Sequence, residues 1–557
     1  MAKKITRREF SKTTILATGG IIAGCHLRNR FDIVIKNGLV FSGDGSEPQK
    51  IDIGIKDGKI TAIDKLESVS ANRTIDAAGL AVAPGFIDIH THTDTELLVD
   101  PRGQSKIHQG VTTEISGNCG YSPFPLNEDD RAELDQNLSE KYGIHADWRD
   151  TAGFLTAIER KGTSLNYVTL TGHGNLRAYV VGKNDVAPTA EQMKQMKRVL
   201  AESLEQGSFG LSTGLEYAPG SYASTEELIE LSKVVAAHQG IYATHMRNED
   251  DFVEEAVAEA LRICREAEVS TEISHLKACN QNNWHKVDHL LEMISNAIEQ
   301  GLPVLADRYP YIAYSTGLST FLPLWARQGS TDEILQRLQD NSLLPKIRAY
   351  AAKRGSRIGG WDRVVIASCN REENKQWQGK SIAECSRNSS LEPFEFIQQL
   401  LIAEHNSVDI VGFAMNEDNL KKVLQADFVT IGSDGNAISP TGKLGQGKPH
   451  PRYYGTFPRV LGKYGREEKL FDLATAIKKM TGLPAKKFYL KSRGLIAKGY
   501  FADITIFDPA TVIDKATFVD PHHFAAGIKY VLVNGVLTID NEKHTGALSG
   551  QVLRHAS

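Results

Sequence analysis

Six residues of the types that bind metal ions stand at the ends of short apolar segments, far apart along the chain. They are His90, His92, Cys119, His245, His275 and Asp434. His90 and His92 form an HxH motif, and residues two apart in a strand point to the same face, so both imidazoles can reach one ion. Imidazole, thiolate and carboxylate are the ligand types that suit Zn²⁺. One such histidine is as readily a buried structural residue, but six at successive strand ends predict a zinc centre for one or two ions.

The segments that lead to these residues predict a parallel α/β fold. Strand and helix patterns alternate over residues 84–490, and 30 residues separate His245 from His275, the length of a βα unit. The pattern contains nine strands. Eight of them predict a TIM-like (β/α)8 barrel, which places its chemistry at the carboxyl ends of the strands. The ninth, Val364–Ala367, is assigned to an insertion at about residues 316–405. A doubly wound sheet is the alternative, but no Gly-rich nucleotide loop follows the first strand.

Both ends of the chain have short alternating strands instead. Residues 31–83 and 491–557 carry them, with a hairpin signal at Asp57-Gly58 and a second run that is broken at Asn534-Gly535. Two β-rich ends around a long α/β middle predict one small β-sandwich domain that is built from both termini.

Residues 1–30 resemble an export signal. The twin arginine Arg7-Arg8 precedes a weakly apolar stretch that is too short for a permanent membrane span and ends at Cys25. The last four residues of this stretch resemble a lipobox, in which the cysteine carries a lipid. The alternative is a chance cysteine in a cleavage region. The sequence therefore predicts an exported, periplasmic or cell-envelope protein whose contact with the membrane is a lipid anchor at Cys25.

Composition excludes several classes of protein. The 557 residues include 64 Lys and Arg against 68 Asp and Glu, a net charge of −4, and 41% of them are hydrophobic. These are globular values, and the balanced charge gives no reason to expect nucleic acid as a partner. The six cysteines contain no CxxC pair, so neither a disulfide framework nor a zinc knuckle is indicated.

With these motifs the chain resembles the amidohydrolase superfamily, and within it the N-acyl-D-amino-acid deacylase (D-aminoacylase) family, over nearly all of residues 31–555. Many superfamily members carry a carboxylated lysine on the fourth strand. Here that strand reads GSFGLSTGLEY without lysine, and the resemblance implies that Cys119 serves instead. The segments that carry the resemblance are APGFIDIHTHTD (83–94), GVTTEISGNCG (110–120), GLSTGLEYAPG (210–220), THMRNE (244–249), ISHLK (273–277), DRYPY (307–311), IGSDG (431–435) and HPRYYGTFPR (450–459).

The resemblance implies zinc-dependent hydrolysis of the amide bond of an N-acyl-D-amino acid. Cys119, His245 and His275 would hold a tight zinc ion. A second, weaker position would be held or flanked by His90, His92 and Asp434. The resemblance also implies that Asp434 takes the proton of the attacking water and returns it to the leaving nitrogen. The alternative for Asp434 is a carboxylate that only ligates metal.

Four further residues are implied to bind the substrate. Lys277 and Arg452 supply cations for the α-carboxylate, and Tyr217 and Tyr309 match hydroxyl donors of the family. The alternative for Lys277 and Arg452 is a solvated surface charge. Arg247 is equally consistent with an ion pair and with a substrate contact.

The side chain of the substrate is predicted to meet the loop after Tyr311. Phe321, Leu322, Leu324 and Trp325 dominate this loop, with Arg327 further on, which favours a hydrophobic D-residue over an acidic one. The alternative is that this apolar stripe is ordinary packing. Two other functions stay open. The same metal centre could hydrolyse dipeptides that contain a D-residue or other acylated amines, or the chain could be an inactive, lipid-anchored binding protein.

Overall fold

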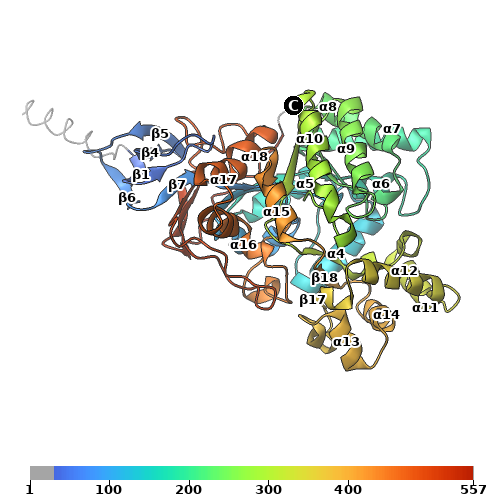
Figure 1. Cartoon of the computed structure of the whole chain (residues 1–557). Helices are drawn as coiled ribbons and strands as arrows, with labels where there is room; N and C mark the ends of the chain where they lie inside the picture. The colour runs from blue at the N-terminus through green and yellow to red at the C-terminus, as the bar shows by residue number, and fades with distance from the viewer. Residues whose placement is uncertain (1–30, 556–557) are drawn as a thin grey trace, which may run out of the picture.

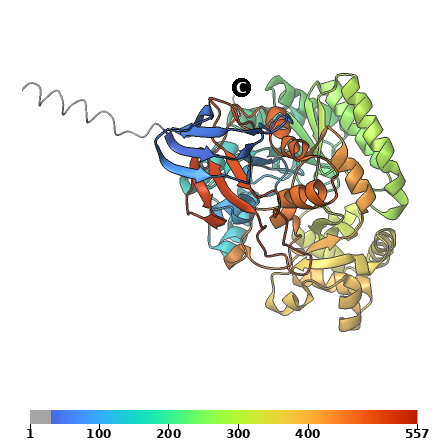
Figure 2. The same cartoon turned by 60° about the vertical axis from the view of Figure 1, so that its left-hand side comes forward.

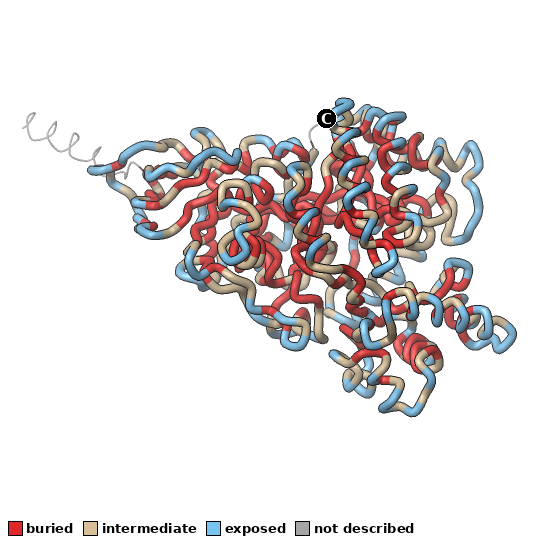
Figure 3. The backbone as a smooth tube through the Cα atoms, in the orientation of Figure 1, coloured by how far each residue is buried: buried red, intermediate tan, exposed pale blue. Residues whose placement is uncertain are grey.

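The computed structural model describes residues 31–555, so the predicted export signal and Cys25 lie outside the described residues. Within the described part, no helix is both long and apolar enough to cross a membrane. The molecule has a strand-rich end, a central α/β body and a separate lobe that holds α11–α14 (Figure 1). Buried residues run through the strands of the central body, while exposed residues follow its outer helices and loops (Figure 3).

Two parallel sheets form the central body. The first has the order β10-β9-β8 and the second the order β11-β12-β13-β14-β15-β19. Nearly all of their residues are buried, as expected where helices cover parallel strands. The strands are β8 (Phe86–Asp88), β9 (Val111–Ser116), β10 (Asn166–Thr169), β11 (Thr171–Gly172), β12 (Gly210–Gly214), β13 (Ile241–His245), β14 (Ser270–Ile273), β15 (Val304–Arg308) and β19 (Val429–Ile431).

Amphipathic helices cover these strands. In α9, Val253, Val257 and Leu261 recur at helical spacing and pack into one core with residues of β14 and β15. The helices of the central body are α2 (Glu96–Val99), α3 (Gln104–Ile107), α4 (Glu128–Tyr142), α5 (Thr151–Lys161), α6 (His173–Val180), α7 (Ala190–Glu205), α8 (Thr225–Ala237), α9 (Val253–Ala267), α10 (Val287–Glu299), α15 (Glu417–Gln425), α16 (Arg452–Arg459), α17 (Leu473–Met480) and α18 (Gly482–Lys487).

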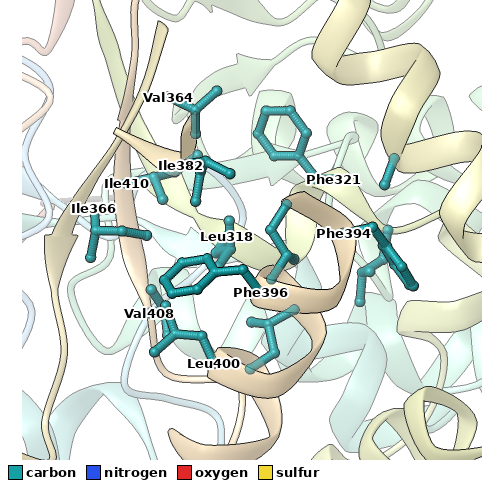
Figure 4. Close-up of a cluster of buried hydrophobic side chains, with 14 of the residues drawn as sticks. Leu318, Phe321, Val364, Ile366, Ile382, Phe394, Phe396, Leu400, Val408 and Ile410 are labelled. Atoms are coloured by element: carbon teal, nitrogen blue, oxygen red, sulfur yellow. The ribbon is translucent and has the colours of Figure 1, made fainter. Parts of the chain in front are cut away.

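The segment between β15 and α15 folds around a core of its own. Val364–Ser368 (β17) belongs to an antiparallel sheet of order β16-β18-β17 and not to the parallel strands. Leu318, Phe321 and Phe394 meet in the core below this sheet (Figure 4). The other elements are β16 (Tyr314–Gly317), α11 (Thr331–Gln339), α12 (Leu344–Arg357), α13 (Ile382–Ser389), α14 (Pro393–Ala403) and β18 (Asp409–Gly412).

The two ends of the chain join in one β-rich region. β7 (Ala81–Pro84) pairs with β20 (Ile504–Phe507) in a seven-stranded sheet of order β23-β22-β21-β20-β7-β2-β3, and Figure 2 shows strands of both termini side by side. A four-stranded sheet of order β5-β4-β1-β6 shares a hydrophobic core with it. The remaining strands are β1 (Phe31–Lys36), β2 (Leu39–Val40), β3 (Gln49–Lys50), β4 (Asp52–Lys56), β5 (Lys59–Asp64), β6 (Ala71–Asp76), β21 (Ile528–Val533), β22 (Val536–Asp540) and β23 (Lys543–His544).

The predicted hairpin at Asp57-Gly58 is confirmed, and the break at Asn534-Gly535 is a hairpin as well. Asp57-Gly58 connects β4 to β5 and Asn534-Gly535 connects β21 to β22. All four residues have positive φ, from 49° to 76°. Such two-residue turns match the twist of the flanking strands and favour Asn-Gly and Asp-Gly sequences.

Candidate active site

The structure brings the six predicted metal ligands together at one edge of the parallel strands. Each residue stands at the carboxyl end of its strand or in the loop that follows. Two groups of these residues have ligand atoms within 4.8 Å of one another. Cys119 belongs to both groups, so its sulfur lies at the centre of the cluster. The first group is His90, His92, Cys119 and Asp434, and the second is Cys119, His245 and His275.

Three of the six residues have a backbone conformation that non-glycine residues rarely adopt. The φ angles are 50° at Cys119, 38° at His275 and 51° at Asp434. Such strain costs about 1–3 kcal/mol for each residue and persists only where the surroundings impose it, often at functional sites. Gly117, two residues before Cys119, has φ 76°, and a Cβ there would lie 2.2 Å from the Leu170 carbonyl oxygen. The Gly-rich loop thus lets Cys119 turn inward while the backbone packs closely against the next strand.

The donor atoms are spaced as zinc requires. The Cys119 sulfur lies 3.4 Å from His90 Nε2 and 3.5 Å from His275 Nε2. Zinc–sulfur bonds of about 2.3 Å and zinc–nitrogen bonds of about 2.0 Å in a tetrahedron separate sulfur and nitrogen by about 3.5 Å. His245 is buried, and neither of its ring nitrogens has a hydrogen-bond partner among the described residues. Because buried polar atoms are rarely left unpaired, this imidazole fits a metal ligand.

The charge state of Cys119 also fits metal binding. Burial alone would raise the pKa of its thiol, but the neighbouring His90 and His275 imidazoles hold that pKa well below its ordinary value. The thiolate is the form of cysteine that ligates zinc. The other four cysteines of the described residues are free thiols, and the pKa of each is raised, chiefly by burial; they are Cys264, Cys279, Cys369 and Cys385.

Two carboxylates that the sequence analysis assigned no role orient the histidines. His90 Nδ1 lies 2.9 Å from Asp307 Oδ2, and His275 Nδ1 lies 2.8 Å from Glu249 Oε1. An Nδ1–H that His90 donates to Asp307 leaves its Nε2 free to face the Cys119 sulfur, an arrangement that fixes ligand histidines in metal sites. At His275, Nδ1 lies between Glu249 and Lys277 Nζ, which is 2.9 Å away, and Nε2 again faces the sulfur. Asp307 and Glu249 stand in the segments DRYPY and THMRNE, but pattern alone does not show which histidine each carboxylate contacts.

Asp434 connects the ligand cluster to Arg452. One oxygen of Asp434 lies 3.0 Å from His92 Nε2 and the other lies 2.8 Å from Arg452 Nη1. Burial would raise the pKa of this carboxyl, but the Arg452 guanidinium and the His92 contact hold it well below its usual range. Asp434 is therefore ionised and can serve either as a ligand or as a proton acceptor.

The four predicted substrate-binding residues all line one cavity of about 1010 Å³, together with Cys119, His245, His275 and Asp434. Lys277 is 4% exposed and pairs with Glu249 at 2.5 Å, while Arg452 is 2% exposed and pairs with Asp434. The alternative that these two are solvated surface charges is therefore wrong. Tyr217 Oη lies 3.3 Å from Thr316 Oγ1.

Tyr309 presents an unused hydroxyl in this cavity. Its side chain is fully buried, and its Oη has no hydrogen-bond partner among the described residues. The Arg452 guanidinium lies 4.7 Å from the centre of the Tyr309 ring. Arg247, in contrast, is an ion-pair residue, because its guanidinium contacts Glu259 at 2.8 Å and two backbone carbonyl groups.

The prediction that the four apolar residues of the insertion contact the substrate side chain is wrong, and the alternative of ordinary packing is confirmed for Phe321 and Leu322. Phe321 and Leu322 are buried in the separate core of the insertion, and Leu324 and Trp325 are 40% and 41% exposed. None of the four is among the described residues that line the cavity. The apolar side chains turn away from the cavity because the insertion must bury a core of its own. From the same segment the cavity receives polar and charged side chains instead, chiefly Tyr314, Ser315, Thr316, Ser319, Thr320, Arg327 and Arg354.

Comparison with known proteins adds relatives that cover most of the chain. Residues 73–304 and 406–539 match the model of the amidohydrolase family, which leaves out the insertion. D-aminoacylase of Alcaligenes xylosoxydans xylosoxydans is 36% identical over 94% of this chain and 97% of its own length. A solved N-acyl-D-glutamate deacylase of Bordetella bronchiseptica, in complex with zinc and a phosphonate inhibitor, has a TM-score of 0.80 at 33% identity and covers 94% of this chain and 99% of that one. A solved D-aminoacylase with a binuclear metal centre has a TM-score of 0.79 at 35% identity and covers 94% and 100%.

Proposed function

Because this chain belongs to the amidohydrolase family and, within it, to the D-aminoacylases, we propose that it hydrolyses the amide bond of N-acyl-D-amino acids with zinc as cofactor. The products are a carboxylate and a free D-amino acid. The observation that carries this proposal is the convergence of the six ligand-type side chains on the Cys119 thiolate, next to a cavity that holds cationic and hydroxyl donors. The D-configuration of the substrate follows from the relatives and not from an observed contact.

Three residues would hold a tight zinc ion and three a second, weaker one. Cys119, His245 and His275 form the first set, because neither ring nitrogen of His245 has a hydrogen-bond partner among the described residues and the Cys119–His275 spacing suits zinc. His90, His92 and Asp434 form the second, with Cys119 shared between the two. Zinc supplies Lewis-acid activation of water and of the amide carbonyl.

The side chains of the protein then have separate tasks. Ionised Asp434 accepts the proton of the attacking water and passes it to the amide nitrogen, which leaves badly as an anion. Arg452 holds the other oxygen of Asp434 and so keeps this carboxylate in place. The Tyr309 hydroxyl and the guanidinium of Arg452 face the cavity as donors for the substrate carboxylate. A hydrogen bond to a charged group contributes about 1.5–3 kcal/mol, enough to favour free acids over uncharged amides.

The test of this function combines metal analysis with a substrate library. We expect one or two zinc ions for each chain, chelator-sensitive hydrolysis of N-acyl-D-amino acids and little hydrolysis of their L-isomers. Dipeptides with a D-residue at the carboxyl end belong in the same library, because they distinguish a deacylase from a dipeptidase. Two outcomes would refute the proposal. In the first, the metal-free protein keeps full activity; in the second, the zinc-loaded protein hydrolyses none of these amides.

One observation favours acidic D-residues as a second candidate substrate class. Arg327 and Arg354 line the cavity from the insertion, and Arg327 Nε is buried without a hydrogen-bond partner. Glu216, which also lines the cavity, accepts a hydrogen bond from Arg327 Nη1 through its backbone carbonyl. Burial would lower the pKa of Arg354, but the Glu216 carboxylate raises it, as does Asp250 nearby. An additional anion on the substrate would therefore be attracted to this wall of the cavity.

We expect Arg327→Met and Arg354→Met each to lower kcat/KM for N-acetyl-D-glutamate by about tenfold or more, since charge-assisted hydrogen bonds are lost. The value for N-acetyl-D-leucine should change little. Arg198→Met is the control, because Arg198 has a 70% exposed side chain on α7. Equal effects on both substrates would show that the two arginines shape the cavity and do not select an anion.

We also propose the finer architecture of the chain. β8, β9, β10 with β11, β12, β13, β14, β15 and β19 would close into one (β/α)8 barrel, with the insertion after the seventh strand and the two terminal sheets as a β-sandwich. One residue separates β10 from β11, and a parallel bridge between Thr91 and Gly435 links the segment after β8 to the one after β19. Both facts support closure.

Export to the cell envelope remains a proposal from the sequence of residues 1–30. If Cys25 carries a lipid, Cys25→Ser moves the protein from the membrane fraction of the native bacterium to the soluble fraction without loss of activity. An unchanged distribution in that fractionation would argue against a lipid anchor.

A further inference from the structure

Lys106 is a fully buried lysine that lies outside the cavity. It stands on α3, and its ammonium group lies 2.8 Å from Asp88 Oδ2, 2.6 Å from Ser433 Oγ and 2.8 Å from the Gly435 carbonyl oxygen. An ammonium group has three donors, so every donor of Lys106 is used. Lysine is almost never fully buried unless it is paired, and here all three acceptors lie around one short segment.

That segment is the turn that carries Asp434. Ser433 and Gly435 flank Asp434 in sequence, and Asp88 Oδ1 also accepts the backbone N–H of Ser433 at 2.8 Å. The Gly435 N–H donates to Ser433 Oγ at 3.2 Å. Lys106 and Asp88 together therefore bind both sides of Asp434 without contact to its carboxylate.

The turn needs such support because its backbone is strained. Asp434 has φ 51°, and its N–H donates to the His90 carbonyl oxygen at 2.8 Å. A non-glycine residue keeps this conformation only when its surroundings over-determine it. Relaxation of the turn would swing the carboxylate away from His92 Nε2, which it approaches to 3.0 Å.

We propose that Lys106, with Asp88 and Ser433, is the positioning residue that aims the Asp434 carboxylate at the reacting atoms. The effect on turnover rests on the proposed function, in which Asp434 transfers the proton. The effect on geometry does not depend on it. A misplacement of about 1 Å at a reacting group can lower a rate by about 100-fold.

Lys487 provides a matched control. It is also buried, and its ammonium group donates to Ser270 Oγ at 2.8 Å, the Thr271 carbonyl oxygen at 2.6 Å and the Pro303 carbonyl oxygen at 2.8 Å. These acceptors lie at the amino ends of β14 and β15, the opposite end from the ligand cluster. Lys487→Met therefore removes another buried lysine with three hydrogen bonds, none of which reaches Ser433, Asp434 or Gly435.

The experiment compares zinc-loaded wild type, Lys106→Met, Ser433→Ala and Lys487→Met. For Lys106→Met we expect kcat to fall by about 100-fold with KM within about threefold and with the tight zinc retained. Ser433→Ala keeps the Lys106–Asp88 pair and should lower kcat by about tenfold. Lys487→Met should lower the unfolding temperature but leave kcat of the folded protein unchanged.

A crystal structure of Ser433→Ala gives a readout that needs no turnover. We expect Asp434 Oδ1 to move out of hydrogen-bond distance of His92 Nε2 in that variant, while the ring positions of His245 and His275 stay the same. If Lys106→Met does not fold, Ser433→Ala still decides the question through both kcat and structure. The contrary outcome has two parts: Asp434 keeps its place in the Ser433→Ala structure, and kcat of the Lys106 and Ser433 variants falls no more than kcat of Lys487→Met. That outcome would show that Lys106 only stabilises the fold. If the zinc-loaded wild type hydrolyses none of the substrates but Asp434 is displaced in Ser433→Ala, the proposed function is refuted. The positioning role of Lys106 is then still supported.

Discussion

Replacement of Cys119 by alanine is expected to abolish binding of the tight zinc ion. We expect kcat/KM to fall by at least about 10⁴-fold, since the metal supplies the Lewis acid for amide hydrolysis. Cys119 is the one residue that both ligand groups share. Its sulfur lies 3.4 Å from His90 Nε2 and 3.5 Å from His275 Nε2, so its loss opens both metal positions at once. Zinc content by atomic emission and kcat/KM for N-acetyl-D-amino acids check this expectation.

The same variant should also unfold at a lower temperature in the presence of zinc. A ligand that binds only the folded state stabilises it by about 4 kcal/mol at 1,000 times its dissociation constant, and this gain disappears with the site. Cys264→Ala is the control, because Cys264 is buried on α9, packs in a hydrophobic core and belongs to neither group of metal-ligand residues. Full zinc content and activity in Cys119→Ala would contradict the proposed centre.

The Asp434→Asn variant is expected to keep the tight zinc ion, but its kcat should fall by about 10²–10⁴-fold. This is the range that one general acid–base group contributes. Asparagine has the shape of aspartate and still reaches His92 and Arg452, but it cannot accept a proton. Zinc analysis and steady-state kinetics on the metal-replete variant separate loss of chemistry from loss of metal.

Asp409→Asn is the control for that variant. Asp409 also lines the cavity, but its carboxylate accepts a hydrogen bond from Ser368 Oγ at 2.7 Å on the insertion. Its replacement should leave kcat within about twofold, as for most surface substitutions away from the chemistry. Near-wild-type turnover of zinc-replete Asp434→Asn would mean that Asp434 only ligates metal and that another group transfers the proton.

The apolar residues of the insertion, from Phe321 to Trp325, were wrongly predicted to contact the substrate. Phe321 and Leu322 are hydrophobic whether they line a substrate cavity or a structural core, and the sequence does not distinguish the two. The antiparallel sheet of β16, β17 and β18 and the helices on it create a second core, and these side chains fill it. Arg327 and Arg354 reach the cavity instead, so the expected substrate chemistry of this wall changes from apolar to cationic.

Lys277 and Arg452 show a related limit. Their place after strands predicts that they face the cavity, and both line it. The partner of Lys277, Glu249, follows a different strand, and the partner of Arg452, Asp434, stands 18 residues before it after the same strand, β19. Each pairing depends on how the loops fold over the strand ends, which the spacing alone does not show. Asp307 and Glu249 went without a role for the same reason, because each orients a histidine from a different βα unit.

The chain itself determines the ligand types, their places at strand ends and the turns that connect strands. These features are local, since a positive φ at Asn534-Gly535 or an HxH in a strand depends on neighbouring residues alone. Tertiary structure decides which carboxylate fixes which imidazole, which cations keep a free donor and which buried lysine holds the strained turn at Asp434. Those choices depend on distances between segments that are tens to hundreds of residues apart, and packing alone sets such distances.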